Sequence, residues 1–525
     1  MKKFLLIILF LVFSVFSFAF IFPNTTEKTI NIYDKIKVLN QIISLVNDNY
    51  VDNVNWDEAL DGAFEGMLEK LDPHSSYISR DKLENVNEQF YGKFEGIGIE
   101  FDLLGGYITV ISPIIDSPSD KVGLQPGDKI ISIDGEDAFE ITREEVFNTL
   151  RGPKGSPVTL TIRRPGLDDT FNVEIIRDQI PIYSLISSFM IDKEVGYMRL
   201  TRFASTTYDE VSNAINQLRS NGMNKLIFDL RTNSGGYLEQ AVNISDLFIT
   251  SNDTIVYTSG RKDKITDSFK ASSKKGFDDF SLIILINRWS ASASEIVAGA
   301  VQDLDRGLIL GETSFGKGLV QRQWPLKDGS AVRVTIARYY TPSGRLIQRP
   351  YNDGLRNYYQ ELNNEDREEV LDSLRKDQKK YKTKKGRIVY GGGGITPDVF
   401  LPVFEYDSTI SKIVNNPQRL AFNWATNFSK DLDKKWDNTS DFTKNFLITD
   451  SMLANFFEFV SNRNVQIDKE LDLNNKNYLK SILKAEIAGS KWGRSGYYQV
   501  FISNDPQVVK AISYFKDAKK FITYN

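Results

Sequence analysis

The stretch LIILINRWSASASEIVAGAVQDL, residues 282–304, determines which fold class the chain can adopt. Residues 282–286 form a continuous apolar run, as expected of a strand that is buried on both faces of a parallel sheet. Residues 293–304 are rich in small side chains and predict a helix. Ser292 stands between the two, where backbone N–H groups and the helix dipole can stabilise a developing oxyanion. Ser292 is therefore a candidate nucleophile, unless this serine cluster only caps the helix and fills space.

A second strand and loop of the same kind precede this stretch. The apolar run 226–230 leads into Arg231-Thr232-Asn233-Ser234-Gly235-Gly236 and a predicted helix near 237–248. Repeated strand–loop–helix units indicate a largely parallel α/β sheet with function at the strand ends. Gly235 and Gly236 offer unobstructed backbone donors for an oxyanion hole, although the pair is equally compatible with a plain turn.

The scarcity of two residue types restricts the chemistry. The chain has 525 residues, no Cys and one His, His74. Thiol nucleophiles, disulfides and multi-histidine zinc sites are therefore excluded. His74 follows Pro73 and is interpreted as a turn residue, which leaves lysine as the natural general base.

Lys317 is the lysine best placed for that role. It lies in GETSFGKG, residues 311–318, after the apolar strand 308–310, and its neighbouring glycines allow close packing. A lysine acts as a base only when burial or a nearby cation lowers its pKa far below about 10.4. An ordinary exposed lysine is the alternative. The segment also approaches a phosphate-binding loop, but Gly318 stands where Mg²⁺ binding requires Ser or Thr, so nucleotide binding is not expected.

Residues 90–178 have a different pattern, with short alternating strands, a helix at 142–150 and strands at 157–163 and 170–176. The loop Gly96-Ile97-Gly98-Ile99 can direct N–H groups at a terminal carboxylate, and its strand edge can accept an added peptide strand. Arg151 could help to hold that carboxylate, although a solvated arginine is the alternative.

The N-terminus carries an export pattern. Lys2 and Lys3 precede an apolar run at 4–22, and Pro23 ends it. The run is nearly long enough to span a bilayer, so a cleaved signal peptide and an uncleaved membrane anchor are both open. A net charge of −4 gives no basic field that would attract nucleic acid.

Several motifs, in order, resemble the C-terminal processing peptidases, also called tail-specific proteases. The resemblance runs from about residue 40 to 400 and implies a crotonase-like α/β core with an inserted PDZ domain that binds substrate C-termini. The motifs that carry it are Leu71-Asp72-Pro73-His74-Ser75-Ser76-Tyr77, Phe94–Gly98, Gly123–Asp128, Arg231–Gly236, Ser290–Glu295, Gly311–Gly318 and Gly392–Asp398. Trp289, before this serine motif, and Ser119-Asp120 in the PDZ region depart from the family pattern.

The resemblance assigns roles position by position. Ser292 would be the nucleophile, Lys317 the general base and Gln321 the residue that orients the lysine. Backbone N–H groups of Ala293 and of the Gly235–Gly236 turn would form the oxyanion hole. No metal or cofactor is implied.

The expected architecture is α/β and multidomain, with helical segments at both ends. The predicted regions are a signal or anchor at 1–23, an N-terminal helical region at 30–87, a PDZ domain at 88–178, a peptidase core at 179–350, a charged surface insertion at 351–388, a return to the core at 389–404 and a helical C-terminal extension at 405–525.

The predicted function is that of a serine endopeptidase which recognises protein C-termini and cleaves exported polypeptides. The alternative is a catalytically silent PDZ adaptor that binds C-termini without cutting. The chain would be exported to the periplasmic side of a bacterial inner membrane, with membrane contact through residues 4–22. The resemblance leaves room for a regulatory lipoprotein or adaptor as a partner and for a homo-oligomer; nucleic acid is not expected.

Overall fold

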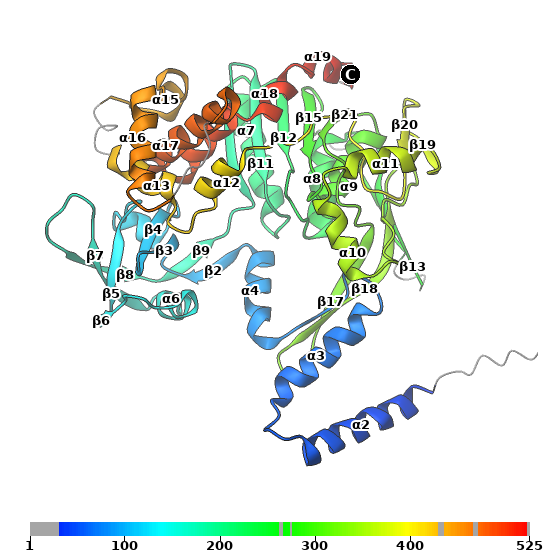
Figure 1. Cartoon of the computed structure of the whole chain (residues 1–525). Coiled ribbons are helices and arrows are strands. Elements are labelled where there is room, and N and C mark those ends of the chain that lie inside the picture. Colours follow the sequence, from blue (N-terminus) through cyan, green and yellow to red (C-terminus); the bar gives the residue numbers. More distant parts are fainter. Residues whose placement is uncertain (1–30, 262–265, 273–275, 429–434, 466–470, 522–525) are drawn as a thin grey trace, which may run out of the picture. The chain divides into compact units, whose positions relative to one another are not determined.

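The computed structural model describes residues 31–261, 266–272, 276–428, 435–465 and 471–521 (Figure 1). The chain divides into two compact units, Met1–Met67 and Leu68–Asn525. The predicted export segment at 1–23 lies outside the described residues. Among the residues that are described, no helix is both long enough and apolar enough to cross a membrane.

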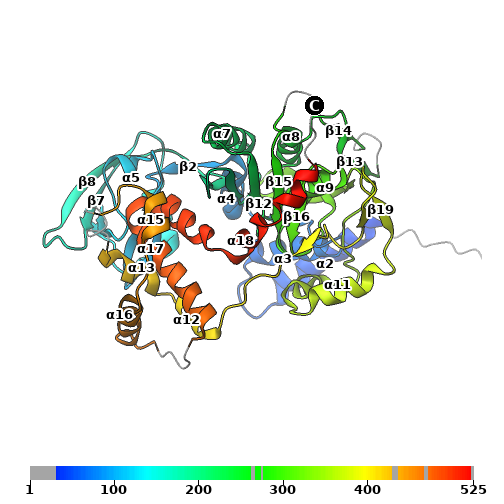
Figure 2. The same ribbon diagram turned by 90° about the horizontal axis from the view of Figure 1, so that it is seen from above.

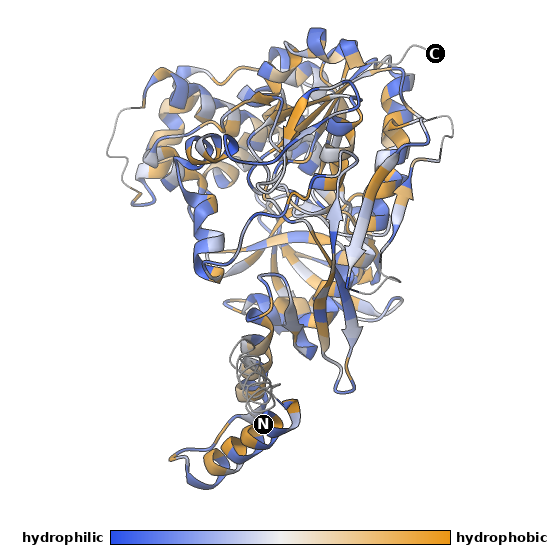
Figure 3. Cartoon of the chain, turned by 90° about the vertical axis from the view of Figure 1, so that its right-hand side faces the viewer, coloured by the Kyte–Doolittle hydropathy of each residue, from blue (hydrophilic) through white to orange (hydrophobic). Residues whose placement is uncertain are grey.

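The first unit contains helix α2 (Ile32–Asn49) and most of α3 (Trp56–Glu69). The side chain of Asn31 caps α2 by accepting the Tyr33 N–H at 3.1 Å. Apolar and polar residues alternate along α2 (Figure 3), and none of its residues is buried. The predicted N-terminal helical segment is confirmed.

The centre of the second unit is a six-stranded sheet with the order β10-β11-β12-β15-β16-β21. β10 is antiparallel to β11, and the other neighbours run parallel, as the apolar runs predict. The strands are β10 (Leu185–Met190), β11 (Val195–Leu200), β12 (Lys225–Asp229), β15 (Ser281–Ile286), β16 (Leu308–Gly311) and β21 (Val399–Phe400).

Helices cover both faces of this sheet. One face packs on α7 (Thr207–Ser220), α8 (Leu238–Phe248) and α9 (Ala293–Asp303), through alternate residues such as Phe228 and Ile284. The opposite face, including Ile227 and Ile283, packs on α18 (Pro506–Ile512) and α19 (Phe515–Ala518). The C-terminal extension therefore completes the core.

A second, antiparallel sheet lies beside the first, with the order β1-β18-β13-β14 and β17 paired to β18. Its strands are β1 (Ser76–Ile78), β13 (Thr254–Gly260), β14 (Ser268–Lys270), β17 (Leu319–Pro325) and β18 (Ala331–Tyr340). Residues 76–78 fall in the region expected to be helical, but Tyr77 pairs with Val332, so this segment is a strand of the core.

The predicted PDZ domain is inserted between two paired strands. β2 (Lys93–Gly96) leads into it, β9 (Asp178–Pro181) leads out, and the two are antiparallel. Its sheet has the order β3-β4-β5-β7-β8, with β6 on β5, so β3 is an edge strand. Helix α4 (Arg80–Tyr91) precedes β2. The elements of the inserted domain are β3 (Ile99–Leu104), β4 (Tyr107–Pro113), α5 (Pro118–Lys121), β5 (Lys129–Ile133), β6 (Glu136–Asp137), α6 (Arg143–Leu150), β7 (Pro157–Arg163) and β8 (Phe171–Ile176).

The charged region after residue 350 contains more order than its composition indicates. It holds α10 (Leu355–Gln360), the 3₁₀ helix η2 (Glu361–Asn363), α11 (Arg367–Arg375) and the hairpin β19 (Lys380–Lys382) and β20 (Ile388–Tyr390). Tyr358 and Leu362 are buried against Ala291 and Phe315. The insertion therefore packs on the loops expected to carry catalysis and is not only a surface feature.

The C-terminal region is helical, as predicted, and has its own aromatic core around Trp424, Phe442 and Phe456. Phe422 forms a separate buried contact with Leu104 and Ile111 of the PDZ sheet, and Figures 1 and 2 show α13 and α17 beside that domain. The remaining elements are α12 (Ser408–Val414), α13 (Leu420–Ala425), η3 (Thr426–Phe428), α15 (Thr439–Asn445), α16 (Asp450–Ser461), α17 (Leu473–Ser503) and η4 (Lys519–Phe521).

Candidate active site

Ser292 occupies the turn between β15 and α9 in a conformation unusual for a residue with a side chain, with φ +54° and ψ −112°. Such strain costs roughly 1–3 kcal/mol and persists where its surroundings enforce it. Ser290 fixes the turn, because its hydroxyl donates to the Leu230 carbonyl at 2.8 Å and accepts the Asn287 N–H at 2.9 Å. Ser292 is half-buried, and its hydroxyl donates no hydrogen bond to another residue in the described part of the chain. It is free to act as a nucleophile.

The glycine loop lies directly against this serine. Gly235 has φ +102°, and a Cβ there would lie 2.8 Å from Ser292 Cβ and 3.0 Å from Ala293 N. Gly236 has φ +150°, and a Cβ there would lie 2.2 Å from the Phe203 carbonyl oxygen. Both the backbone conformation and the close approach require glycine at these positions.

Asn233 determines which N–H groups of this loop are available. Its side-chain oxygen accepts the Gly235 N–H at 2.9 Å, and its carbonyl accepts the Ala291 N–H at 2.9 Å. The Gly235 N–H, predicted as an oxyanion donor, is thus already engaged. The N–H groups of Gly236 and Ala293 have no partner among the described residues, which leaves these two donors for an oxyanion.

Lys317 lies in the loop between β16 and β17. The Phe315 N–H donates to the Ser290 carbonyl at 2.9 Å, which ties this loop to the turn of the serine. Burial, and then the charge of Arg333, lower the pKa of Lys317 to about 8. Its Nζ has no hydrogen-bond partner within the described ranges, and none links it to the Ser292 hydroxyl. Lys317 therefore has the lowered pKa that a general base needs at neutral pH.

The buried carboxylate of Glu295 joins the two loops. Its Oε2 accepts the Ser292 N–H at 2.8 Å and the Lys317 N–H at 2.9 Å. Its Oε1 accepts the Gly316 N–H at 2.7 Å and the Ser314 hydroxyl. Burial raises the pKa of Glu295 to about 7, although these four donors favour the ionised form. One oxygen atom thus fixes the backbones of both candidate catalytic residues. Glu295 is the last residue of the serine motif Ser290–Glu295, but the sequence does not indicate its partners, which only the fold brings together.

Gln321 is held by a chain of side chains from the segment before the PDZ domain. Its Nε2 donates to Thr335 Oγ1 at 3.4 Å, and that hydroxyl donates to Asp72 Oδ1 at 3.0 Å. Ser75 closes the network by donating to Asp72 Oδ2 at 2.6 Å. With its amide nitrogen engaged, Gln321 keeps its carbonyl oxygen as an acceptor.

His74 lies in the turn after Pro73, as predicted, and its N–H donates to Asp72 Oδ1 at 2.9 Å, which joins it to the same network. Its Nε2 is 3.1 Å from the Tyr358 hydroxyl, and its ring packs near Phe315. Burial, and then the charge of Lys317, lower the pKa of His74 to about 3. His74 is therefore neutral near pH 7, and it lies close enough to Lys317 for the charge of the lysine to act on it.

A buried ion-pair network holds Arg231, the residue at which the glycine loop begins. The Arg231 guanidinium contacts Asp229 at 2.6 Å and Asp505 at 2.9 Å, and it donates to the Gln507 side-chain oxygen at 2.6 Å. Asp505 and Gln507 belong to the C-terminal extension. The loop that faces Ser292 is thus anchored by residues far along the chain.

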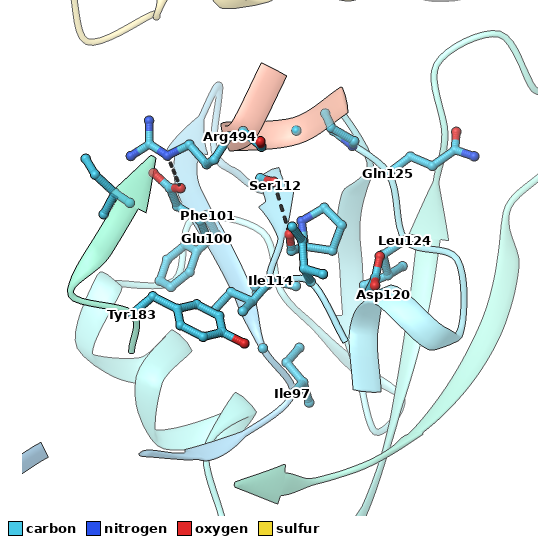
Figure 4. A pocket seen from close by; sticks show the side chains of 18 of the residues that line it. Ile97, Glu100, Phe101, Ser112, Ile114, Asp120, Leu124, Gln125, Tyr183 and Arg494 are labelled. Atoms are coloured by element: carbon cyan, nitrogen blue, oxygen red, sulfur yellow. Dashed lines mark hydrogen bonds and ion pairs between the residues drawn. The ribbon is translucent and has the colours of Figure 1, made fainter. Parts of the chain in front are cut away.

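A cavity of about 1400 Å³ lies away from these residues, at the PDZ domain (Figure 4). The PDZ domain contributes Gly96, Ile97, Gly98, Ile99 and Arg151 to its wall, which brings together the residues predicted to bind a C-terminus. The carbonyls of Ile97 and Gly98 accept the N–H groups of Ser119 and Ile114, at 3.0 Å and 2.9 Å. Their own N–H groups have no partner in the described structure, as a carboxylate-binding loop requires.

Arg151 borders this cavity but is already paired. Its Nη1 lies 2.9 Å from Glu88 Oε2 and donates to Asn85 at 3.3 Å. The guanidinium also lies over the rings of Phe94 and Phe147. Within the described ranges, no group of three or more His, Cys, Asp or Glu side chains could hold a metal ion.

Family models match four parts of the chain. Peptidase family S41 matches residues 194–357, and a PDZ domain matches 109–164. The activating protease CtpB N-terminal domain matches 22–82. A family of unknown function, DUF8443, matches 415–493 within the C-terminal extension.

Curated relatives agree with these matches. The chain is 39% identical to a carboxy-terminal-processing protease of Bartonella bacilliformis over 62% of this chain and 75% of that protein. It is 34% identical to carboxy-terminal processing protease CtpA of Bacillus subtilis, over 60% and 67%. It is 33% identical to a carboxyl-terminal-processing protease of a Synechocystis strain, over 65% and 84%.

Proposed function

Because the chain belongs to the carboxy-terminal processing proteases of peptidase family S41 and is a serine-type peptidase, we propose that Ser292 and Lys317 form its catalytic dyad. Its substrates are polypeptides whose C-termini bind at the PDZ domain. The observation that carries the proposal is the Glu295 oxygen shared by the Ser292 and Lys317 N–H groups. It fixes a free hydroxyl and a lysine of lowered pKa in one arrangement.

In the first step, neutral Lys317 removes the proton from the Ser292 hydroxyl as Oγ attacks the peptide carbonyl carbon. The carbonyl oxygen becomes an oxyanion that accepts hydrogen bonds from the Gly236 and Ala293 N–H groups. The intermediate collapses, the C–N bond breaks, and the Lys317 ammonium gives its proton to the leaving amine. The products are an acyl-enzyme and a new N-terminus.

In the second step, water attacks the ester carbonyl while Lys317 takes the proton. The C–O bond to Ser292 then breaks, and the proton returns to Oγ. During this step we expect Gln321 to accept a hydrogen bond from Lys317 Nζ through its carbonyl oxygen, a contact that forms only when the lysine moves toward it, because Thr335 engages the amide nitrogen of Gln321.

The substrate tail binds by strand addition. The edge strand β3 offers backbone groups to an extended peptide, and the Ile97 and Gly98 N–H groups receive the terminal carboxylate. Arg151 adds positive charge beside that carboxylate.

The test uses the full-length chain and an unstructured polypeptide with an apolar C-terminus, in free-acid and amidated forms. Ser292→Ala and Lys317→Ala are each compared with wild type, and Lys327→Ala serves as the matched control because Lys327 is exposed in the same sheet region. We expect cleavage by wild type and Lys327→Ala only, and weaker cleavage of the amidated substrate.

Cleavage that survives Ser292→Ala would overturn the dyad. Equal cleavage of amidated and free-acid substrates would overturn recognition of the C-terminus. Tight, tail-dependent binding by wild type without cleavage would instead favour the silent adaptor.

Export to the periplasmic side of a bacterial inner membrane belongs to the same proposal. It is supported by Lys2 and Lys3 before the apolar run 4–22. Fractionation of cells that produce the full-length chain tests it, and recovery in the cytoplasm would contradict it. A regulatory lipoprotein or adaptor and a homo-oligomer stay predictions, which co-purification and light scattering would test.

A further inference from the structure

The cavity at the PDZ domain has walls from three parts of the chain. Besides PDZ residues, strand β10 and Arg202 of the core contribute, and so do residues 490–495 and Tyr498 of α17. Figure 4 shows Arg494 at the cavity beside Glu100 and Phe101 of the PDZ domain. The third wall lies outside the segments that match the peptidase and PDZ families.

A kink in α17 shapes this third wall. Gly493 interrupts the helix with φ +61° and ψ −157°. A Cβ at Gly493 would lie 3.1 Å from Ser112 Oγ, at the end of β4. The close approach and the left-handed backbone both favour glycine, so the chain turns at the point where it meets the PDZ domain.

The C-terminal extension, which carries this wall, is attached to the PDZ sheet by an apolar contact from α13 and an ionic contact from α17. Phe422 is buried with Leu104 and Ile111. Arg494 Nε lies 2.7 Å from Glu100 Oε2. The apolar contact provides most of the attachment, since an exposed ion pair contributes about 0–1 kcal/mol.

Each wall contributes an arginine to the cavity. Arg151 pairs with Glu88, and Arg494 pairs with Glu100. Arg202 donates to the Gln89 side chain and has no carboxylate partner among the described residues. Arg494 remains 45% exposed, so it can contact a ligand without breaking its ion pair. The cavity thus has positive charge for more than one carboxylate of a ligand.

We propose that α17 forms the third wall of the tail-binding site and that Arg494, together with Arg202, selects tails with an acidic side chain near the C-terminus. This inference rests on the proposed recognition of C-termini. The terminal carboxylate occupies the Ile97 and Gly98 N–H groups, and the acidic side chain meets the arginines. A charge-assisted hydrogen bond of this kind is worth enough to change affinity about tenfold.

The experiment uses the full-length chain and a set of peptide substrates with one apolar last residue. A single Glu, Gln or Lys is placed at each of the five preceding positions in turn. For wild type we expect the KM of the Glu peptides to lie about tenfold below the KM of the Gln peptides at one or two adjacent positions. The Lys peptides should have the highest KM, and kcat should be the same for all three. Added salt should reduce the difference.

Two substitutions at the ion pair give opposite results if the inference is correct. Arg494→Gln should bring the Glu and Gln peptides to the same KM. Glu100→Gln should widen the difference, because it leaves Arg494 without a competing carboxylate. Arg143→Gln is the control, since Arg143 is exposed on the PDZ domain, pairs with Asp102 and does not line the cavity. It should behave as wild type.

Equal KM values for Glu and Gln in wild type would overturn the inference, and so would a preference that survives Arg494→Gln. A change of the same direction in Arg494→Gln and Glu100→Gln would show that the ion pair is only structural. Amidation of the peptide distinguishes a failure of tail recognition from a failure of the selection for acidic tails. If amidation leaves KM unchanged, tail recognition itself fails; if amidation raises KM while Glu and Gln are equal, only the selection of acidic tails fails.

Discussion

The proposed catalytic centre and the cavity proposed to bind substrate tails are built in different ways. The centre is closed, with Gly235 in contact with Ser292 and a buried Glu295 that satisfies four donors. The cavity is open, and its walls come from the PDZ domain, the core and the C-terminal extension. Its charged side chains are partly exposed.

The difference separates chemistry from recognition. A closed centre tolerates no displacement, so changes there should appear in kcat. An open cavity with exposed charges should respond with modest changes in KM. Substitutions in both regions therefore test this contrast.

Gly235→Ala should have the largest effect. The new Cβ would lie 2.8 Å from Ser292 Cβ, and φ is +102°. The loop must move away from the serine, and we expect kcat to fall about a thousandfold, as when an oxyanion donor is lost. Steady-state kinetics measure it, with Gly62→Ala as the control because a Cβ added at Gly62 would meet no other described atom within 4 Å. Near-normal kcat would mean that the centre is more tolerant than its contacts indicate.

Glu295→Gln should come next. The amide would turn an NH₂ group toward backbone N–H donors and leave buried donors without partners, which costs about 1–3 kcal/mol each. We expect kcat to fall about a hundredfold with little change in KM, which corresponds to about 2.7 kcal/mol. The matched control is Glu239→Gln, since Glu239 occupies the first turn of α8 as Glu295 does in α9 but is exposed. An equal loss in both variants would argue against a role in positioning.

Asp505→Asn tests whether the extension supports the glycine loop. Arg231 would lose one of its two carboxylate partners and keep Asp229. We expect kcat on a short substrate without a recognised tail to fall about tenfold. Asp517→Asn, at an exposed pair with Lys520, is the control. A change confined to thermal stability would show that the contact is not coupled to the loop.

The pH dependence follows from the pKa of Lys317, which burial and Arg333 lower to about 8. Only neutral Lys317 accepts the serine proton, so kcat/KM should rise about tenfold per pH unit below that value and level off above it. Arg333→Gln removes a cation and so raises the pKa of Lys317. The profile should move to higher pH, with activity near pH 7 about threefold lower. Arg338→Gln, on the exposed side of the same strand, should leave the profile in place.

Arg151→Gln should have the smallest effect. Its guanidinium is already engaged by Glu88, so its contribution to a bound carboxylate is limited. We expect KM for a free-acid tail to rise about twofold to threefold, within the range of an exposed ion pair, and kcat to stay unchanged. A tenfold rise would show that Arg151 is the main carboxylate contact.

The fold could be predicted where the pattern is local. The buried strands at 226–230 and 282–286 and the helix after Ser292 depend on apolar runs and small residues within one segment. Residues 76–78 could not be predicted as a strand, because only the pairing of Tyr77 with Val332 makes them one. Tyr358 and Leu362 are isolated apolar residues in a charged segment, and no periodic face marks them as buried.

The candidate site divides in the same way. Ser292, Lys317 and the glycine loop stand in motifs that can be recognised along the chain. Glu295 makes its contacts only because the loop of Lys317, about twenty residues further along the chain, folds back against it. Contacts between separate loops generally depend on the fold in this way. Asp72 reaches Gln321 only through Thr335, 263 residues from Asp72. Arg494 in the sequence is indistinguishable from a solvated arginine on a helix.

The anchor of the glycine loop has a consequence for biosynthesis. Gln507 follows Arg231 by 276 residues, and Ser292 and Lys317 lie between them. A nascent chain therefore contains its proposed nucleophile and base long before the ribosome adds the partners of Arg231. We expect a protease assembled in this order to gain its full activity only after residues 505–507 have been translated and folded onto the core, so that growing chains do not cut one another.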